Sequence, residues 1–409
     1  MSASSELRAI LLSALALPAL TACSQTVNST DAGDDAPSDA AVDVATDTPT
    51  DTPADAAADV ATDTTPLCSF GSPARDCLTM AQAEDRIRNP PGKIIPRDAG
   101  ADAAIDVPMT SGGCYVPSAI TDTCCNRAVA VDRVGTTCCY TFCAGACCGR
   151  PFDVDGAPRT ASLDDGGDWC DRATPVSPLD EVTREALAAA WRRDALMEHA
   201  AIASFARFTL HLMAHGAPPE LVADVQRAAL DEVDHARLCF SLATRFDGRS
   251  LGPGALDVSG ALASTTLAGC VRAAAVEGCI GETCAALVAQ TRRDAATDPE
   301  ARAALDRIAL DESRHAALAW RFVAWAVAKG DRDAREAAEH AFRAMTSTLA
   351  APTAMPDGVD EAAWRAFGML TPREERDAMR TAIRDVIAPC ARALFTRHAT
   401  ADVTRAVEA

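Results

Sequence analysis

From about residue 183 to residue 330, apolar positions recur every three or four residues, which predicts long amphipathic helices. Breaks in the pattern divide this region into four helices, at residues 183–215, 218–246, 264–296 and 298–330. The link at Gly216 is so short that the first two helices must be antiparallel neighbours. Asp298 and Pro299 supply an N-cap and a first helical residue for the fourth helix, and Gly330 ends it.

The connection between the second and third helices, residues 247–263, is long and rich in Gly and Ser. Helices of this length extend roughly 45 Å, and the connection can stretch about 55 Å, enough to run along their side. The sequence therefore predicts an all-α protein with a four-helix bundle at residues 172–330 and one long crossover. Residues 331–409 continue the helical pattern, around 332–349 and 372–397, and are expected to pack on the bundle.

The N-terminus has the pattern of an export signal, in which Arg8 precedes an apolar stretch that ends at Leu20. The stretch is followed by Thr21-Ala22-Cys23, which resembles the bacterial lipobox. This resemblance implies a signal peptide at residues 1–22, cleavage before Cys23 and a lipid on that cysteine. The alternative is a plain secretory signal with a chance cysteine. Either interpretation predicts a location outside the cytoplasm, and the lipobox adds attachment to the membrane of the bacterial envelope through Cys23.

Residues 23–66 form an acidic segment composed mainly of Asp, Ala, Thr, Val and Pro. Its ten Asp, with no Lys, Arg or Glu, contribute half of the net charge of −20. Such a segment buries too little apolar surface to fold, so we expect an extended tether. The rest of the chain is mildly acidic, which argues against nucleic acid as a partner.

Residues 67–171 hold eleven of the 17 cysteines and little periodic apolar pattern. In an exported chain this density predicts an irregular region held together by disulfides. The spacing of Cys139, Cys143 and Cys147 leaves zinc or an iron–sulfur cluster as an alternative.

Two copies of an Asp-Glu-x-x-His motif stand in the second and fourth predicted helices. Glu232 and His235 form one pair, and Glu312 and His315 form the other. A spacing of three places both side chains of a pair on one helical face. The first and third predicted helices add a glutamate 34 or 35 residues upstream, at Glu198 and Glu277. Four carboxylates and two imidazoles suit two iron ions, with manganese as the alternative.

These motifs resemble those of the ferritin-like di-iron carboxylate superfamily, and are most similar to its oxygen-activating members, ribonucleotide reductase small subunits and bacterial multicomponent monooxygenases. The resemblance covers about residues 183–330. It implies that the metal ligands are Glu198, Glu232, His235, Glu277, Glu312 and His315, with Glu232 and Glu312 as bridges. It also implies that Asp231 orients His315 and that Asp311 orients His235. Glu282 lies five residues after Glu277 and is the alternative or additional ligand on the third helix; we prefer Glu277 because the two spacings are then nearly equal.

The expected function is that of an exported di-iron oxidoreductase that reacts with dioxygen or peroxide. Its substrate and electron donor are not encoded in any motif of the sequence. The alternative is a lipid-anchored binding or structural protein in which the metal only stabilises the bundle.

Overall fold

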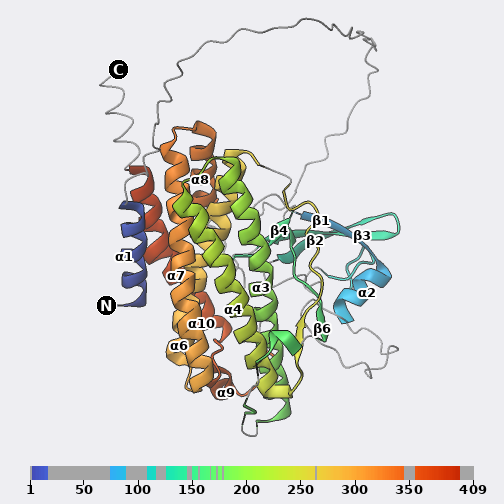
Figure 1. Cartoon of the computed structure of the whole chain (residues 1–409). Helices are drawn as coiled ribbons and strands as arrows, with labels where there is room; N and C mark the ends of the chain where they lie inside the picture. Colours follow the sequence, from blue (N-terminus) through green and yellow to red (C-terminus); the bar gives the residue numbers. More distant parts are fainter. Residues whose placement is uncertain are drawn as a thin grey trace, which may run out of the picture. The chain divides into compact units, whose positions relative to one another are not determined.

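A computed structural model of the chain describes residues 2–16, 74–88, 108–116, 126–144, 150–154, 157–165, 167–171, 174–176, 179–262, 265–344 and 355–396. The described part is mostly helical, in agreement with the predicted fold class (Figure 1). The predicted tether and Cys23 lie outside the described residues. None of the described helices combines the length and the apolar character needed to cross a membrane.

Two long helices, α3 (Glu181–Ala214) and α4 (Pro219–Asp247), form the first helical hairpin. They pack along each other, as the short link at Gly216 requires, and this glycine has a positive φ of 62°. Buried Trp191, Phe205 and Phe208 of α3 and Phe240 of α4 belong to the apolar cores on which the hairpin rests. The boundaries agree with the predicted helices to within about two residues.

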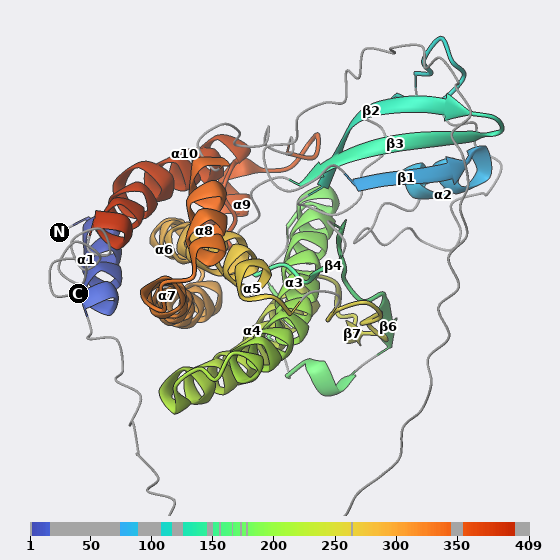
Figure 2. The ribbon, with the colours of Figure 1, turned by 90° about the horizontal axis from the view of Figure 1, so that it is seen from above.

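The second hairpin pairs α7 (Pro299–Ala328) with a helix that has three successive parts. These parts are α5 (Leu267–Ala273), the π-helical segment η3 (Ala274–Glu282) and α6 (Thr283–Ala295). The Asp298 side chain accepts a hydrogen bond from the Ala301 amide, and Pro299 stands at the first position, so the predicted N-cap of α7 is confirmed. Contacts between α4 and α7 join the two hairpins, and Figure 2 shows the helices from above.

The C-terminal residues add α8 (Arg332–Ala344), α9 (Glu361–Ala366), α10 (Pro372–Thr381) and the π-helical η5 (Ala382–Ile387). The helix α1 (Ala3–Ala16) contacts α7 and η5. Its Leu7, Leu11 and Leu15 are buried in the same apolar core as Trp320 and Phe322 of α7. Most of the stretch predicted as an export signal therefore forms a packed helix in this structure.

The prediction that the cysteine-rich region is irregular is wrong in one respect. An antiparallel sheet in the order β1-β3-β2 is formed by β1 (Ala74–Thr79), β2 (Asn126–Val134) and β3 (Thr137–Ala144). The helix α2 (Met80–Arg88) follows β1 in the chain. Two disulfides, Cys77–Cys139 and Cys114–Cys138, both involve β3. The pairing of β1 with β3 spans about 60 residues, and the strands lack a regular alternation of apolar and polar residues, so sequence periodicity alone did not reveal them.

Shorter strands fix the segment before α3 and the long connection after α4. Strands β4 (Asp153–Val154) and β5 (Ala157–Pro158) pair with each other, and β6 (Leu163–Asp165) pairs with β7 (Leu251–Pro253). A 3₁₀ turn, η2 (Gly167–Trp169), follows β6. Because β7 lies within the connection from α4 to α5, this connection is held by backbone pairing with the cysteine-rich region. Cys170, Cys239, Cys270, Cys279, Cys284 and Cys390 have free thiols.

Candidate metal centre

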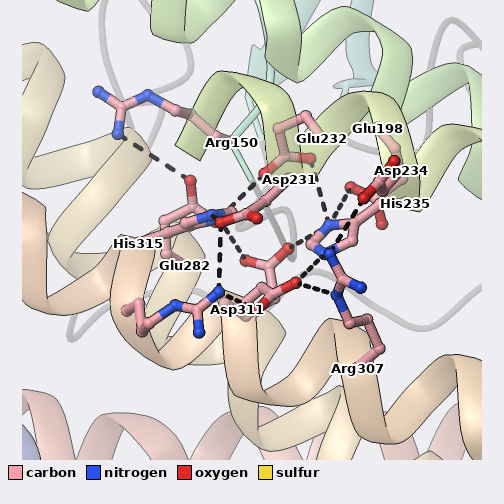
Figure 3. Close-up of polar contacts among 12 residues, drawn as sticks. Arg150, Glu198, Asp231, Glu232, Asp234, His235, Glu282, Arg307, Asp311 and His315 are labelled. Carbon is pink, nitrogen blue, oxygen red and sulfur yellow. Dashed lines mark hydrogen bonds and ion pairs between the residues drawn. The ribbon is translucent and has the colours of Figure 1, made fainter. Parts of the chain in front are cut away.

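Acidic and histidine side chains from α3, α4, η3 and α7 converge between the two hairpins (Figure 3). Two groups could each hold a metal ion because their ligand atoms lie within 4.8 Å of one another. The first group is Glu198, Glu232, His235 and Glu312, and the second is Glu282, Glu312 and His315. Glu312 is common to both groups. All of these residues except the half-buried Glu198 are almost fully buried.

The two histidines face the same two glutamates through their Nδ1 atoms. His235 Nδ1 lies 3.6 Å from Glu232 Oε2 and 3.8 Å from Glu312 Oε1. His315 Nδ1 lies 3.0 Å from Glu232 Oε1 and 4.0 Å from Glu312 Oε2. Each glutamate thus directs one oxygen toward each histidine. This is the arrangement that a carboxylate needs in order to bridge two metal ions.

The outer nitrogens of the histidines are held by aspartates of the opposite hairpin. Asp311 Oδ2 lies 3.1 Å from His235 Nε2, and Asp231 Oδ2 lies 3.3 Å from His315 Nε2. An Nε2–H that donates to the carboxylate leaves the Nδ1 lone pair facing the cluster, where it can bind a metal. The structure therefore brings these four residues together in the crossed pairing that the superfamily resemblance implies.

Two arginines of α7, which the sequence analysis did not single out, hold these aspartates in turn. Arg307 Nε donates to Asp311 Oδ2 at 3.0 Å, and its second guanidinium nitrogen reaches Asp234. Arg314 donates to both Asp311 and Asp231. The spacing of Arg307 four residues before Asp311, and of Arg314 three residues after it, was the available signal. It was overlooked because such pairs are common on exposed helix surfaces.

The structure places Glu282, and not the preferred Glu277, among the clustered side chains. Glu282 is fully buried within the second group. Glu277 instead accepts hydrogen bonds from Arg207 at 2.8 Å and from Ser204 at 2.9 Å. The preference rested on regular α-helical spacing, whereas both glutamates lie in the π-helical segment η3, whose turn holds more residues. The wider turn brings Glu282 to His315 and leaves Glu277 beside α3.

The cluster contains buried polar atoms that have no hydrogen-bond partner, namely both carboxylate oxygens of Glu232 and Glu282, Glu312 Oε2, and Nδ1 of His235 and His315. His315 Nδ1 lies 3.0 Å from Glu232 Oε1, but the two atoms do not form a hydrogen bond. Buried carboxylates without partners are costly unless cations neutralise them. Four glutamates carry the charge that two divalent cations would balance, so the residues present fit the metal pair.

The protonation equilibria of the cluster reflect this excess of acid. Burial, and then repulsion by the neighbouring carboxylates, raises the pKa of Glu198 and Glu312 well above the ordinary value. Burial also raises the pKa of Glu282. Burial lowers the pKa of His315, but the hydrogen bond with Asp231 and the attraction of Glu232 outweigh it and raise the pKa to about 9. Protons therefore neutralise the cluster when no cation does.

A pocket of about 420 Å³ lies beside the cluster, between α1, α4 and α7. Asp231 and His315 form part of its wall, together with apolar side chains such as Ile10, Ala228 and Leu318.

Comparisons of the chain with protein-family models, curated proteins and solved structures give no match. The geometry of the site and the resemblance of its two motifs therefore carry the functional argument.

Proposed function

We propose that this chain is a ferritin-like protein that holds a carboxylate-bridged pair of iron ions between two helical hairpins, and that it is an oxidoreductase of dioxygen or peroxide. One observation carries the proposal: Glu232 and Glu312 each direct separate oxygens to His235 and His315. Carboxylate-rich ligation with one imidazole for each metal favours iron, and manganese is the alternative. The long connection between α4 and α5 supports the ferritin-like topology.

The side chains around the cluster have distinct roles in this proposal. Glu198 and Glu282 would each bind one metal ion, and Glu232 and Glu312 would each offer one oxygen to both ions. Bound ferrous ions would supply electrons for the reduction of dioxygen or peroxide. The ring of Phe205, 5.1 Å from that of His315, excludes water on the α3 side. An organic substrate or further ferrous iron would supply the electrons for the next cycle.

Anaerobic metal loading followed by exposure to oxygen tests this function. We expect the metal-free protein to bind two equivalents of Fe²⁺ per chain, because the four glutamates balance that charge. Admission of oxygen should then consume dioxygen and produce the absorption of ferric carboxylate. Protein that binds neither Fe²⁺ nor Mn²⁺ would show the proposal to be wrong.

A second candidate function is a metal-stabilised structural or binding protein. The crossed Asp–His pairs favour it as well, because the ligands come from both hairpins and a bound metal would join them. If this second function is the correct one, the same experiment should show two tightly bound metal ions, a higher melting temperature of the metal-bound protein and no oxygen consumption.

We further propose that the protein is exported and anchored to the bacterial envelope by a lipid on Cys23. The expected result is a mature protein that begins at Cys23, carries a lipid and fractionates with membranes. The Cys23→Ala variant should lack the lipid and the membrane association, whereas Cys170→Ala, which removes a free thiol outside the leader, should retain both. Mass spectrometry of the N-terminal peptide measures the result. A mature protein that retains α1 as its N-terminus would contradict the proposal.

A further inference from the structure

Arg150 reaches the metal cluster from outside the four helices that carry the ligands. It lies within the cysteine-rich region of the chain and is only 3% exposed. Its guanidinium lies over the rings of Phe205 and Phe208, at 4.6 and 4.5 Å from their centroids. The neighbouring Asp153 carbonyl accepts a hydrogen bond from Arg207 of α3. The segment is therefore fixed on α3, with its positive charge inside the protein.

Both glutamates of η3 lie close to this charge, with Arg150 Nε 3.9 Å from Glu277 Oε2, but Glu277 is held by hydrogen bonds and Glu282 is not. Glu277 is bound by Arg207 and Ser204, and Ser204 also accepts a hydrogen bond from Arg150 Nε at 3.1 Å. The NH1 nitrogen of Arg150 has no hydrogen-bond partner and lies 4.0 Å from Glu282 Oε1 (Figure 3). Arg150 thus acts on the ligand Glu282 through its charge, and a distance of 4.0 Å is too long for a hydrogen bond that would fix the carboxylate.

Gly278 provides the room for this approach. A Cβ atom at this position would lie 3.1 Å from Arg150 NH1 and 2.3 Å from the Cβ of Ala319 on α7. Glycine at this place lets η3 pack closely on α7 while the guanidinium lies against its backbone. The buried charge beside Glu282 is therefore accommodated by the fold.

Charge is distributed unequally over the two proposed metal positions. The position at His235 has Glu198, Glu232 and Glu312 around it. Within the residues that the structure describes, no arginine or lysine forms an ion pair with any of these three glutamates. The position at His315 has Glu282, Glu232 and Glu312 around it, and Glu282 is partly neutralised by Arg150. The two positions thus have equal numbers of carboxylates, but a divalent cation at His315 also meets a nearby positive charge.

We infer that Arg150 is a positioning residue that makes the two metal positions unequal, so that a divalent cation fills the His235 position first and the His315 position with lower affinity. This inference rests on the proposed pair of metal positions. Arg150 makes no hydrogen bond that would hold the Glu282 carboxylate in place for the metal. Its main effect on binding is therefore the repulsion between its positive charge and the cation. Removal of its charge therefore strengthens the second binding step. Residues that surround a metal site commonly change its affinity by about 10- to 100-fold.

An anaerobic titration of the metal-free full-length protein with Mn²⁺ tests the inference, with free Mn²⁺ measured by electron paramagnetic resonance. The expected wild-type result is two steps whose affinities differ by about 10- to 100-fold. Arg150→Met should tighten the second step about tenfold or more and leave the first nearly unchanged. Arg150→Lys retains the positive charge, so the affinities of the two binding steps should remain different. Arg150→Gln is a second uncharged variant that can still donate to Ser204, and it serves if the methionine variant fails to fold.

Arg192→Met is the matched control, because Arg192 is also a buried arginine of the α3 region but pairs with Asp247, away from the cluster. It should lower the melting temperature without changing the ratio of the two affinities. A purely structural role of Arg150 would weaken both steps together, and that result would overturn the inference, as would two equal steps in the wild type. In either case the metal pair itself would stand. Wild-type protein that binds no Mn²⁺ and no Fe²⁺ would instead overturn the proposed function.

Discussion

Glu312→Gln is expected to abolish binding at both metal positions, because Glu312 is the ligand common to the two groups. The metal-free protein should tolerate the change. Burial and repulsion by Glu282 raise the pKa of Glu312 well above its ordinary value, so the charged form of this side chain is unfavourable. A neutral amide of the same size removes this unfavourable charge. Metal should no longer raise the melting temperature. A ligand at 100 times its Kd stabilises the wild type by about 2.7 kcal/mol for each site.

Two other glutamates serve as controls for this experiment. Glu277→Gln breaks a buried ion pair with Arg207 and should destabilise the metal-free protein by about 3–5 kcal/mol, yet retain two metal equivalents. Glu339→Gln, on α8, should measurably change neither the stability of the metal-free protein nor the number of metal equivalents that it binds. Calorimetric titration and thermal unfolding with and without Mn²⁺ give the measurements. Retention of two equivalents by the Glu312 variant would refute its role as the shared ligand.

The affinity for metal at the His315 position should rise steeply with pH, by about 100-fold between pH 6 and pH 8. The pKa of His315 is about 9, so its ring is protonated in the metal-free protein at neutral pH, and the pKa of His235 is raised in the same direction. A metal ion binds only the neutral Nδ1, so each ion displaces at least one proton, which gives tenfold for each pH unit.

The stability of the metal-free protein should respond to pH in the opposite direction. The folded pKa of His315 lies above its unfolded value of about 6.5. The protonated ring therefore contributes stability that is complete below about pH 6.5 and is lost as the pH rises through about 9. Mn²⁺ titrations and melting curves at pH 6, 7 and 8, with proton release measured in weak buffer, check both signs. Asp231→Asn should reduce the pH dependence of metal affinity at the His315 position. An affinity that stays constant across this range would contradict the proposed displacement of protons.

Much of the fold and most of the site follow from local sequence features. The 3.6-residue period predicted α3, α4 and α7 closely because each buries a continuous apolar face. The Asp-Glu-x-x-His spacing selected Glu232, His235, Glu312 and His315, because a spacing of three fixes which side chains share a helix face. Those four residues meet in the structure.

The remaining features depend on interactions that local spacing does not encode. The choice between Glu277 and Glu282 depends on the π-helical turn of η3 and on Arg207, which comes from another helix. Arg150 is an isolated arginine in a segment without periodicity, so no pattern relates it to residues more than 100 positions away. The sheet β1-β3-β2 likewise depends on the pairing of β1 with β3 over a long separation in the chain.

The crossed pairing of Asp231 with His315 and of Asp311 with His235 makes the two hairpins interdependent. Each hairpin carries a complete motif, but the aspartate of that motif serves the histidine of the other. Neither hairpin can therefore prepare a metal position by itself, however well it folds alone. A substitution in one half should therefore also affect the other, and metal uptake would report that both have assembled.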